Sequence, residues 1–258
     1  MEKNKQKEII SPGEIIAEGE DFLPGDWTIK VGDKIISTRL GVADKSERIV
    51  KVVPISGVYI PRRGNTVIGE VVDLNQAGWM IDIKGPYSAF LPMRECPMFI
   101  RESEMESYLS AGDLVAVKVL GVKRGGVDLT TKFRGLGKIR EGIIIEINPH
   151  RVPRVIGKEG SMIRIIKDAT GCDINVGQNG IVWVRGSSVE HELFAKSAID
   201  YVVTNTISEG LTDMVEKWLK DNKPKGLVVE ERSYDEEEEG EEVREERGDR
   251  RENEGESE

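Results

Sequence analysis

Two glycines separated by two residues, Gly157 and Gly160, stand between two short apolar stretches of the chain. Because glycine has no Cβ and tolerates positive φ, a loop with this spacing lets backbone amides come close to a bound phosphate. A helix predicted to begin near Ser161 would direct the positive end of its dipole toward the same point. The loop therefore predicts an anion-binding turn between two helices, which restricts the folds open to the surrounding segment.

The elements predicted on either side of this loop have a definite order. The residues indicate a strand over 142–147, a short helix at 155–156, a second helix over 161–169, strands over 172–176 and 181–184, and a long helix over 189–206. The long helix carries apolar residues at helical spacing: Leu193, Ala195, Ala198, Ile199 and Val202. The order β-α-α-β-β-α is that of a type I KH fold, and this segment resembles the KH family, which binds single-stranded RNA through a G-x-x-G loop.

Basic residues gather around the loop, with five basic and two acidic residues between His150 and Thr170. We expect the RNA-binding residues of this segment to be Arg151, Arg154, Gly157, Lys158, Gly160, Ser161 and Arg164. A glycine-capped helix junction with ordinary surface charge would have the same composition, but the complete element order favours RNA binding. Glu159 departs from the family pattern, since KH loops usually carry basic or neutral residues there and a carboxylate repels phosphate. We therefore expect this loop to contribute less phosphate affinity than the barrel described next.

A second unit is predicted over residues 65–132, with strands over 66–74, 78–84, 87–91, 114–120 and 127–131. A helical or irregular insertion over 93–109 follows the third strand, which matches the OB barrel, and the aromatic cues resemble the S1 family of RNA-binding OB folds. We expect three aromatic residues of this unit to stack on RNA bases: Trp79, Tyr87 and Phe90. We expect four basic residues to follow the RNA backbone: Arg62, Arg63, Lys123 and Arg124. Burial of the aromatic residues and solvation of the charges are equal alternatives.

Residues 9–60 alternate short apolar pieces, such as 34–37 and 49–53, with turns that contain glycine or proline. This pattern predicts a small β unit. A unit of this size buries too little apolar surface to be stable alone, so we expect it to pack on a neighbouring domain or on a partner chain.

An apolar helix predicted over 211–219 precedes a strongly acidic end. Residues 231–258 contain 15 acidic residues and 5 arginines. The net charge of this segment is therefore −10, which is also the net charge of the whole chain. Such a segment cannot bury enough surface to offset the entropy of ordering, so we expect it to be disordered and to act in solubility rather than in partner binding. The rest of the chain is balanced in charge, and a nucleic-acid partner depends on a local basic patch rather than on net charge.

Several functional classes are disfavoured. No apolar run approaches the ~20 residues of a membrane-spanning helix, and the first residues lack the apolar core of a signal peptide, so we expect a cytoplasmic protein. Cys96 and Cys172 belong to no C-x-x-C or Cys/His cluster, which argues against a disulfide or a zinc site. His150 and His191 have no catalytic partner pattern. We therefore predict no catalytic residues, no metal, no cofactor and no enzyme activity.

The combination of an N-terminal β unit, an S1 barrel and a KH module, in this order, resembles the RNA-binding cap subunits of the archaeal exosome, the ribosomal RNA-processing protein four family. The most specific stretches are 12–19, 59–61, 67–71, 78–79, 82–87 and 152–158. The resemblance implies an α+β multidomain protein with a ring-docking β domain over 1–62, an S1-type domain over 63–135, a KH domain over 136–222 and a disordered acidic tail over 223–258.

The same resemblance implies a non-catalytic role. Three such caps, which can be mixed with a second kind of cap subunit, would sit on a hexameric ring of RNase-PH-type subunits. Single-stranded RNA held by the S1 and KH surfaces would pass 3′ end first to phosphorolytic sites elsewhere, and A-rich tails would be favoured.

Two other classes combine the same modules. Transcription elongation or antitermination factors also join S1 to KH and act with RNA polymerase, but they typically carry two KH modules in tandem, and one is visible here. Polynucleotide phosphorylase places KH before S1, which is the reverse of the order in this chain. Both readings are therefore less favoured than the exosome cap.

Overall fold

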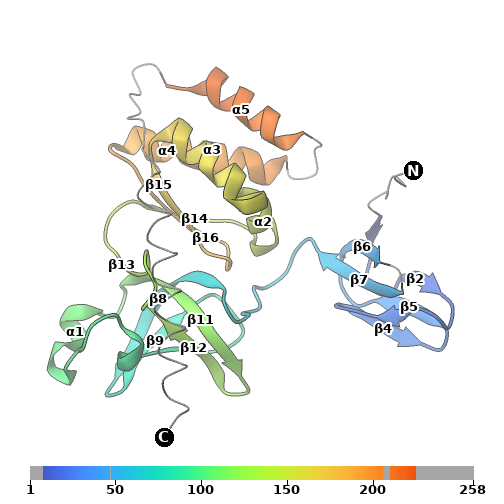
Figure 1. Ribbon diagram of the computed structural model, residues 1–258, viewed down its shortest axis with the longest axis horizontal. Coiled ribbons are helices and arrows are strands. Elements are labelled where there is room, and N and C mark those ends of the chain that lie inside the picture. The colour runs from blue at the N-terminus through green and yellow to red at the C-terminus, as the bar shows by residue number, and fades with distance from the viewer. Residues whose placement is uncertain (1–7, 47, 206–209, 225–258) are drawn as a thin grey trace, which may run out of the picture.

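The computed structural model describes residues 8–46, 48–205 and 210–224, which form three groups of elements in chain order. Figure 1 shows a small β domain on one side, a β-barrel, and a KH domain that lies next to the barrel. The fold is α+β, as the sequence predicted. The predicted acidic tail lies outside the described residues from residue 225 onward.

Within the described residues, the N-terminal domain has seven short strands: β1 (Ile9–Ile10), β2 (Ile15–Glu18), β3 (Leu23–Pro24), β4 (Thr28–Val31), β5 (Lys34–Ser37), β6 (Gly41–Ser46) and β7 (Ile49–Pro54). They form two sheets, with the strand orders β1-β6-β7-β3 and β2-β5-β4. The strands are short because turns interrupt them, as at Gly13 and Gly32, where φ is positive. The buried core takes residues from both sheets and is small: Ile10, Ile16, Ile35, Val50 and Val52. The predicted small β unit is confirmed.

The barrel has five strands: β8 (Thr66–Asn75), β9 (Gly78–Asp82), β10 (Ala89–Pro92), β11 (Leu114–Lys123) and β12 (Gly126–Thr130). Neighbours pair in the order β8-β9-β10-β12-β11, and β11 pairs back with β8, so the barrel is closed. A further strand, β13 (Gly137–Ile139), pairs with β11 although it lies beyond the predicted domain boundary at residue 135. The predicted OB-type barrel is confirmed.

The insertion after β10 is partly helical, as predicted, and contains η1 (Met93–Glu95), η2 (Glu102–Glu104) and α1 (Met105–Tyr108). Its last residues pack against the barrel core. The indole Nε1 of Trp79 donates a hydrogen bond to the carbonyl oxygen of Leu109 at 2.9 Å, and the Trp79 ring lies 5.6 Å from that of Tyr108, centroid to centroid. Trp79 therefore joins the insertion to the barrel.

The KH domain consists of β14 (Ile143–Glu146), η3 (Pro149–Arg151), α2 (Val152–Ile156), η4 (Lys158–Gly160), α3 (Ser161–Thr170), β15 (Asp173–Val176), β16 (Ile181–Arg185), α4 (Val189–Thr204) and α5 (Leu211–Asn222). The three strands form an antiparallel sheet with the order β14-β16-β15. Helices α3 and α4 cover one face of this sheet, and α5 packs on them (Figure 1). This is the predicted β-α-α-β-β-α order.

Of the five apolar residues at helical spacing on the long helix, one does not lie on its buried face. Leu193 is exposed, whereas its neighbour Phe194 is buried. The reason is α5, since Trp218 of this helix stacks on both Phe194 and Tyr201, with ring centroids 6.0 Å and 5.2 Å apart. The buried face of α4 is therefore turned toward α5. The helix ends at Thr204, and Thr206, where it was predicted to end, lies outside the described residues.

The KH domain packs against the outside of the barrel. Ile68 of β8 and Ala116 of β11 are paired across the barrel sheet and are buried together with Ile181 of β16. The backbone N–H of Gln178, in the turn between β15 and β16, donates to the carbonyl oxygen of Thr66 at 2.8 Å. Apolar burial and hydrogen bonds therefore hold the two domains together.

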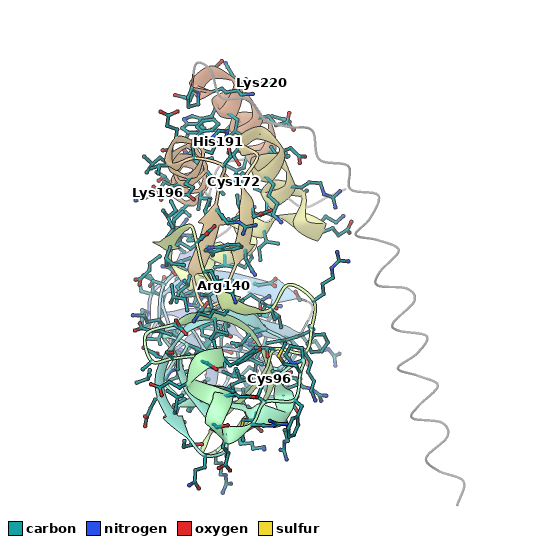
Figure 2. All side chains as sticks on the ribbon, turned by 90° about the vertical axis from the view of Figure 1, so that its left-hand side faces the viewer. Cys96, Arg140, Cys172, His191, Lys196 and Lys220 are labelled. Carbon is teal, nitrogen blue, oxygen red and sulfur yellow. The ribbon has the colours of Figure 1, made fainter. Side chains whose placement is uncertain are left out.

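The two cysteines are both buried, and Figure 2 shows Cys96 in the barrel and Cys172 in the KH domain. Neither forms a disulfide in this structure. Among the described residues, no helix is both long enough and apolar enough to cross a membrane.

Candidate nucleic-acid interface

The G-x-x-G loop has the backbone that its glycines predict. Gly157 and Gly160 have φ of +77° and +75°, and Glu159 between them also has positive φ, +53°. A Cβ added at Gly157 would lie 2.6 Å from the backbone nitrogen of Met162, whereas at Gly160 the nearest atom would be 3.9 Å away. Close packing therefore requires glycine at Gly157, and only the backbone conformation favours it at Gly160.

The predicted basic residues lie on the elements that adjoin this loop. Arg154, Lys158, Ser161 and Arg164 are exposed on α2, η4 and α3, and Arg151 is half-buried at the end of η3. Exposed guanidinium and ammonium groups beside a loop of this shape suit a phosphate backbone. The carboxylate of Glu159 is exposed in the same loop.

The prediction that Trp79 of the barrel stacks on RNA bases is wrong. Its side chain is 0% exposed, so it belongs to the barrel core and has no face on which a base could stack. The alternation of β9 places Trp79 and Ile81 on the inner face of the barrel, where both are buried. The side chain of Trp79 is therefore part of the barrel core and not of its surface.

Tyr87 differs from its prediction in another way. It lies in the loop between β9 and β10, outside any strand, and 44% of its surface is exposed. The next residue, Ser88, accepts a hydrogen bond from the N–H of Val127 at 2.9 Å, which holds this loop beside the β11–β12 turn. Lys123 is the last residue of β11, and the exposed Arg124 follows it in that turn. The structure thus brings Tyr87 near two of the predicted basic residues.

Phe90 is half-buried on β10 and pairs with Asp128 of β12. Asp128 also forms an ion pair with Lys123 at 2.5 Å, so part of the charge of this turn is neutralised. Arg62 and Arg63 are exposed in the segment before β8, and Arg62 shares a pocket with Gly157 of the KH loop.

Sequence reasoning missed two exposed aromatic residues of the barrel. Phe99, in the insertion, is 88% exposed, and Phe133, just after β12, is half exposed with the Nζ of Lys118 4.0 Å from its ring centroid. Lys132 and Arg134 flank Phe133, and this interleaving of basic and aromatic residues is the signal that could have identified it. No comparable signal marks Phe99, because its exposure depends on the path of the insertion.

The N-terminal domain has a surface of a different kind. Ile15 and Ile29 both pair with Ile36 of the central strand β5, so the three side chains form a row across the sheet β2-β5-β4. Ile15 and Ile29 are exposed, as is Val31 two residues further along the edge strand. We call these four residues the isoleucine row. Exposed apolar side chains that lie side by side in this way form a candidate interaction surface.

Within the part of the chain that the structure describes, no group of three or more His, Cys, Asp or Glu side chains is placed to hold a metal ion. The groups that gather on the surface of the barrel and the KH domain are exposed cations and aromatic rings.

Comparison with known proteins agrees with these features. A family model of the KH domain matches residues 142–200, and the model described as Exosome RNA binding protein RRP4 N-terminal domain matches residues 7–56. A crystal structure of a candidate exosome complex RNA-binding protein is similar with a TM-score of 0.57 at 31% identity, and the match covers 64% of this chain and 97% of that one.

Two curated relatives extend the match over most of the chain. Exosome complex component Rrp4 of Methanothermobacter thermautotrophicus is 39% identical over 216 residues, which cover 83% of this chain and 68% of the relative. Exosome complex component Rrp4 of Pyrococcus furiosus is 36% identical over 252 residues, which cover 93% and 95%. Identity at this level across all three domains shows that the chain belongs to the Exosome complex component Rrp4 family.

Proposed function

We propose that this protein is a non-catalytic subunit that holds single-stranded RNA on an exosome and supplies it to catalytic sites on other subunits. Its relatives are named as exosome components, and the matching N-terminal model is that of an exosome RNA-binding protein. The observation that carries the proposal is the separation of two surfaces. Basic and aromatic residues lie on the barrel and KH domain, while the apolar isoleucine row lies on the N-terminal domain. A chain with both surfaces can bring RNA to a partner without chemistry of its own.

The isoleucine row is the proposed docking face for a ring of RNase-PH-type subunits. Exposed Ile15, Ile29 and Val31 would lose their contact with water on assembly, which is favourable by ~25 cal/mol per Å² of apolar surface. The small core of this domain also fits an element that is stabilised by a partner. We propose three copies on a hexameric ring, in a cap that can include a second kind of subunit.

The proposed path of RNA runs over the barrel and the KH loop, with the 3′ end leading toward the ring. Because the two domains are held together by apolar contacts and hydrogen bonds, a strand bound to one stays close to the other. Exposed Tyr87 and Phe133 offer ring faces on which bases can stack, and we propose that A-rich tails are favoured. We further propose a cytoplasmic location, where such transcripts would be met.

Purification of the tagged full-length chain from its native cells tests this function. We expect RNase-PH-type subunits to copurify, native mass measurement to give three copies of this chain on each ring, and the ring to degrade RNA faster with the chain than without it. The chain alone should leave RNA intact in the presence of inorganic phosphate. Copurification with RNA polymerase instead of the ring, or RNA cleavage by the isolated chain, would overturn the proposal.

A further inference from the structure

A pocket lies where the N-terminal domain, the segment before β8 and the KH domain meet. Trp27 and Arg39 line it from the N-terminal domain, Tyr59 and Arg62 from the connecting segment, and His150 and Gln178 from the KH domain. We call it the junction pocket. Its volume is about 470 Å³, within the usual range of small-molecule sites.

The charged side chains of the junction pocket have one sign. Among the described residues that line the pocket, Arg39 and Arg62 carry a positive charge, and none is an aspartate or a glutamate. The guanidinium of Arg39 lies 3.9 Å from the centroid of the Trp27 ring, which orients it. Arg62 faces Asp26 at 3.9 Å, but both side chains are about 70% exposed, so this pair is weak and leaves Arg62 available to another anion.

Two polar atoms in the walls lack a partner. Nε2 of His150 and Oε1 of Gln178 are buried and have no hydrogen-bond partner among the described residues. Buried polar atoms are nearly always paired, so an unpaired atom in a pocket wall indicates a ligand or a water molecule there. Burial and the nearby charge of Arg39 lower the pKa of His150, so its imidazole is neutral at pH 7 and can donate or accept a hydrogen bond.

The remaining walls are apolar or flat, with Tyr59, Ile60, Pro149, Pro153 and Ile156 among them. Gly157, the first residue of the G-x-x-G loop, also lines the pocket, so a strand bound at that loop reaches it directly. The pocket thus combines arginines, flat apolar walls and two unpaired polar atoms. A ligand that matches all three must have an anionic group, a flat ring and a polar ring edge.

We propose that the junction pocket binds one nucleotide of a single-stranded RNA, with its phosphate on Arg39 and Arg62 and the edge of its base on His150 and Gln178. The inference rests on the RNA-binding function proposed above. It adds a site at the junction of the domains that shares Arg62 with the predicted barrel site and Gly157 with the KH loop, and it makes the N-terminal domain a contributor to RNA binding through Trp27 and Arg39.

The chain has two histidines, which allows a direct test by NMR. The imidazole C–H signals of the full-length protein would be followed while adenosine 5′-monophosphate is added, with His150→Gln used to assign the signals. We expect the His150 signal to shift to saturation with a Kd of about 1 mM, as suits a single small nucleotide. His191, on α4 and hydrogen-bonded to Ser188, should stay in place and serves as the internal control.

Two further probes separate the possible ligands. Inorganic phosphate and adenosine each carry half of the proposed ligand and should shift the His150 signal at least ~10-fold more weakly than the nucleotide. An equal response to phosphate alone would make the pocket a site for a small anion, and no response to the nucleotide would show that it is not a nucleotide site; either result overturns the proposal.

A variant pair connects the pocket to RNA binding. Arg39→Gln should weaken the binding of adenosine 5′-monophosphate and of a ten-nucleotide single-stranded RNA by ~10-fold, because it removes a charge-assisted hydrogen bond. Arg94→Gln, at an exposed arginine of η1 outside the pocket, should leave nucleotide binding unchanged. Unchanged RNA affinity in Arg39→Gln would reject the pocket while leaving the RNA-binding function intact. A wild-type chain that binds no RNA at all would instead reject that function.

Discussion

Asn179 of the KH domain pairs with the backbone of Ile68 in the barrel as a neighbouring strand would. Its Nδ2 donates to the carbonyl oxygen of Ile68 at 2.6 Å, and its Oδ1 accepts from the N–H of the same residue at 3.3 Å. The same Nδ2 also donates to the carbonyl oxygen of Ile83 at 3.0 Å. One buried side chain therefore satisfies three backbone groups of another domain, and this fixes how the KH loop stands relative to the barrel.

Asn179→Asp should lower the free energy of unfolding by about 1–3 kcal/mol, because a carboxylate of the same shape cannot donate to Ile68 and Ile83 and would be buried. Chemical denaturation measures the loss. The control is Asn75→Asp, since Oδ1 of Asn75 only accepts, from the N–H groups of Ala77 and Gly78, and a carboxylate can do the same. Equal effects of the two substitutions would show that the Asn179 contacts do not stabilise the domain pair.

Glu159→Lys should tighten binding of single-stranded RNA. The exposed carboxylate lies in the loop that is proposed to face the RNA phosphates, and its replacement by an ammonium removes a repulsion and adds an attraction. In the salt dependence of the affinity, the slope of log K against log [salt] should steepen by roughly one charge, or ~0.7. Glu159→Gln should give about half of the gain in binding free energy. An RNA affinity unchanged in both variants would place this loop outside the RNA path.

Tyr87→Ala should weaken RNA binding by about 1–3 kcal/mol through loss of stacking, while the free energy of unfolding changes by no more than ~0.5 kcal/mol. Tyr87→Phe, which keeps the ring, should bind RNA like the natural protein. Trp79→Ala, in contrast, should lower the free energy of unfolding by about 3–5 kcal/mol, because it leaves a cavity in the barrel core. Fluorescence anisotropy and denaturation measure the two effects, and a stable Trp79→Ala would contradict the assignment of this side chain to the core.

Ile29→Lys should abolish copurification of the catalytic ring without unfolding the chain, because a charge placed in the isoleucine row opposes apolar docking. The circular dichroism spectrum of the isolated chain should be unchanged. Val72→Lys, at an exposed apolar residue of the barrel, is the matched control and should still copurify the ring. If the Ile29 variant still copurified the ring, the docking face would lie on another surface of the chain.

Asp113 should make the stability of the barrel depend on pH. A hydrogen bond from Nζ of Lys138 and one from the N–H of Ser110 hold the pKa of its carboxyl below the ordinary value. Since the folded chain favours the charged form, this stabilisation is present above the ordinary pKa of about 4 and is lost as the pH falls through the lower folded value. The difference in unfolding free energy between the natural protein and Asp113→Asn should therefore shrink below about pH 4. A difference that does not change with pH would contradict this.

Much of the architecture could be read from neighbouring residues. The spacing of Gly157 and Gly160 predicted the loop and the helix that follows it, and alternating apolar residues predicted all five barrel strands. The errors came where a side chain depends on distant partners. Leu193 has helical spacing but α5 covers Phe194 instead, and Trp79 suits a binding face by composition but faces inward.

The amino-acid sequence alone determined the three modules, their order and the basic loop, because turn chemistry and periodicity act between residues a few positions apart. Only the tertiary structure decided how those modules face one another. Asn179 looks like an ordinary turn residue, yet its partner Ile68 stands 111 positions away. Likewise, Arg39 and Gln178 line one pocket only because the N-terminal and KH domains pack at the same junction, and no local pattern encodes that packing.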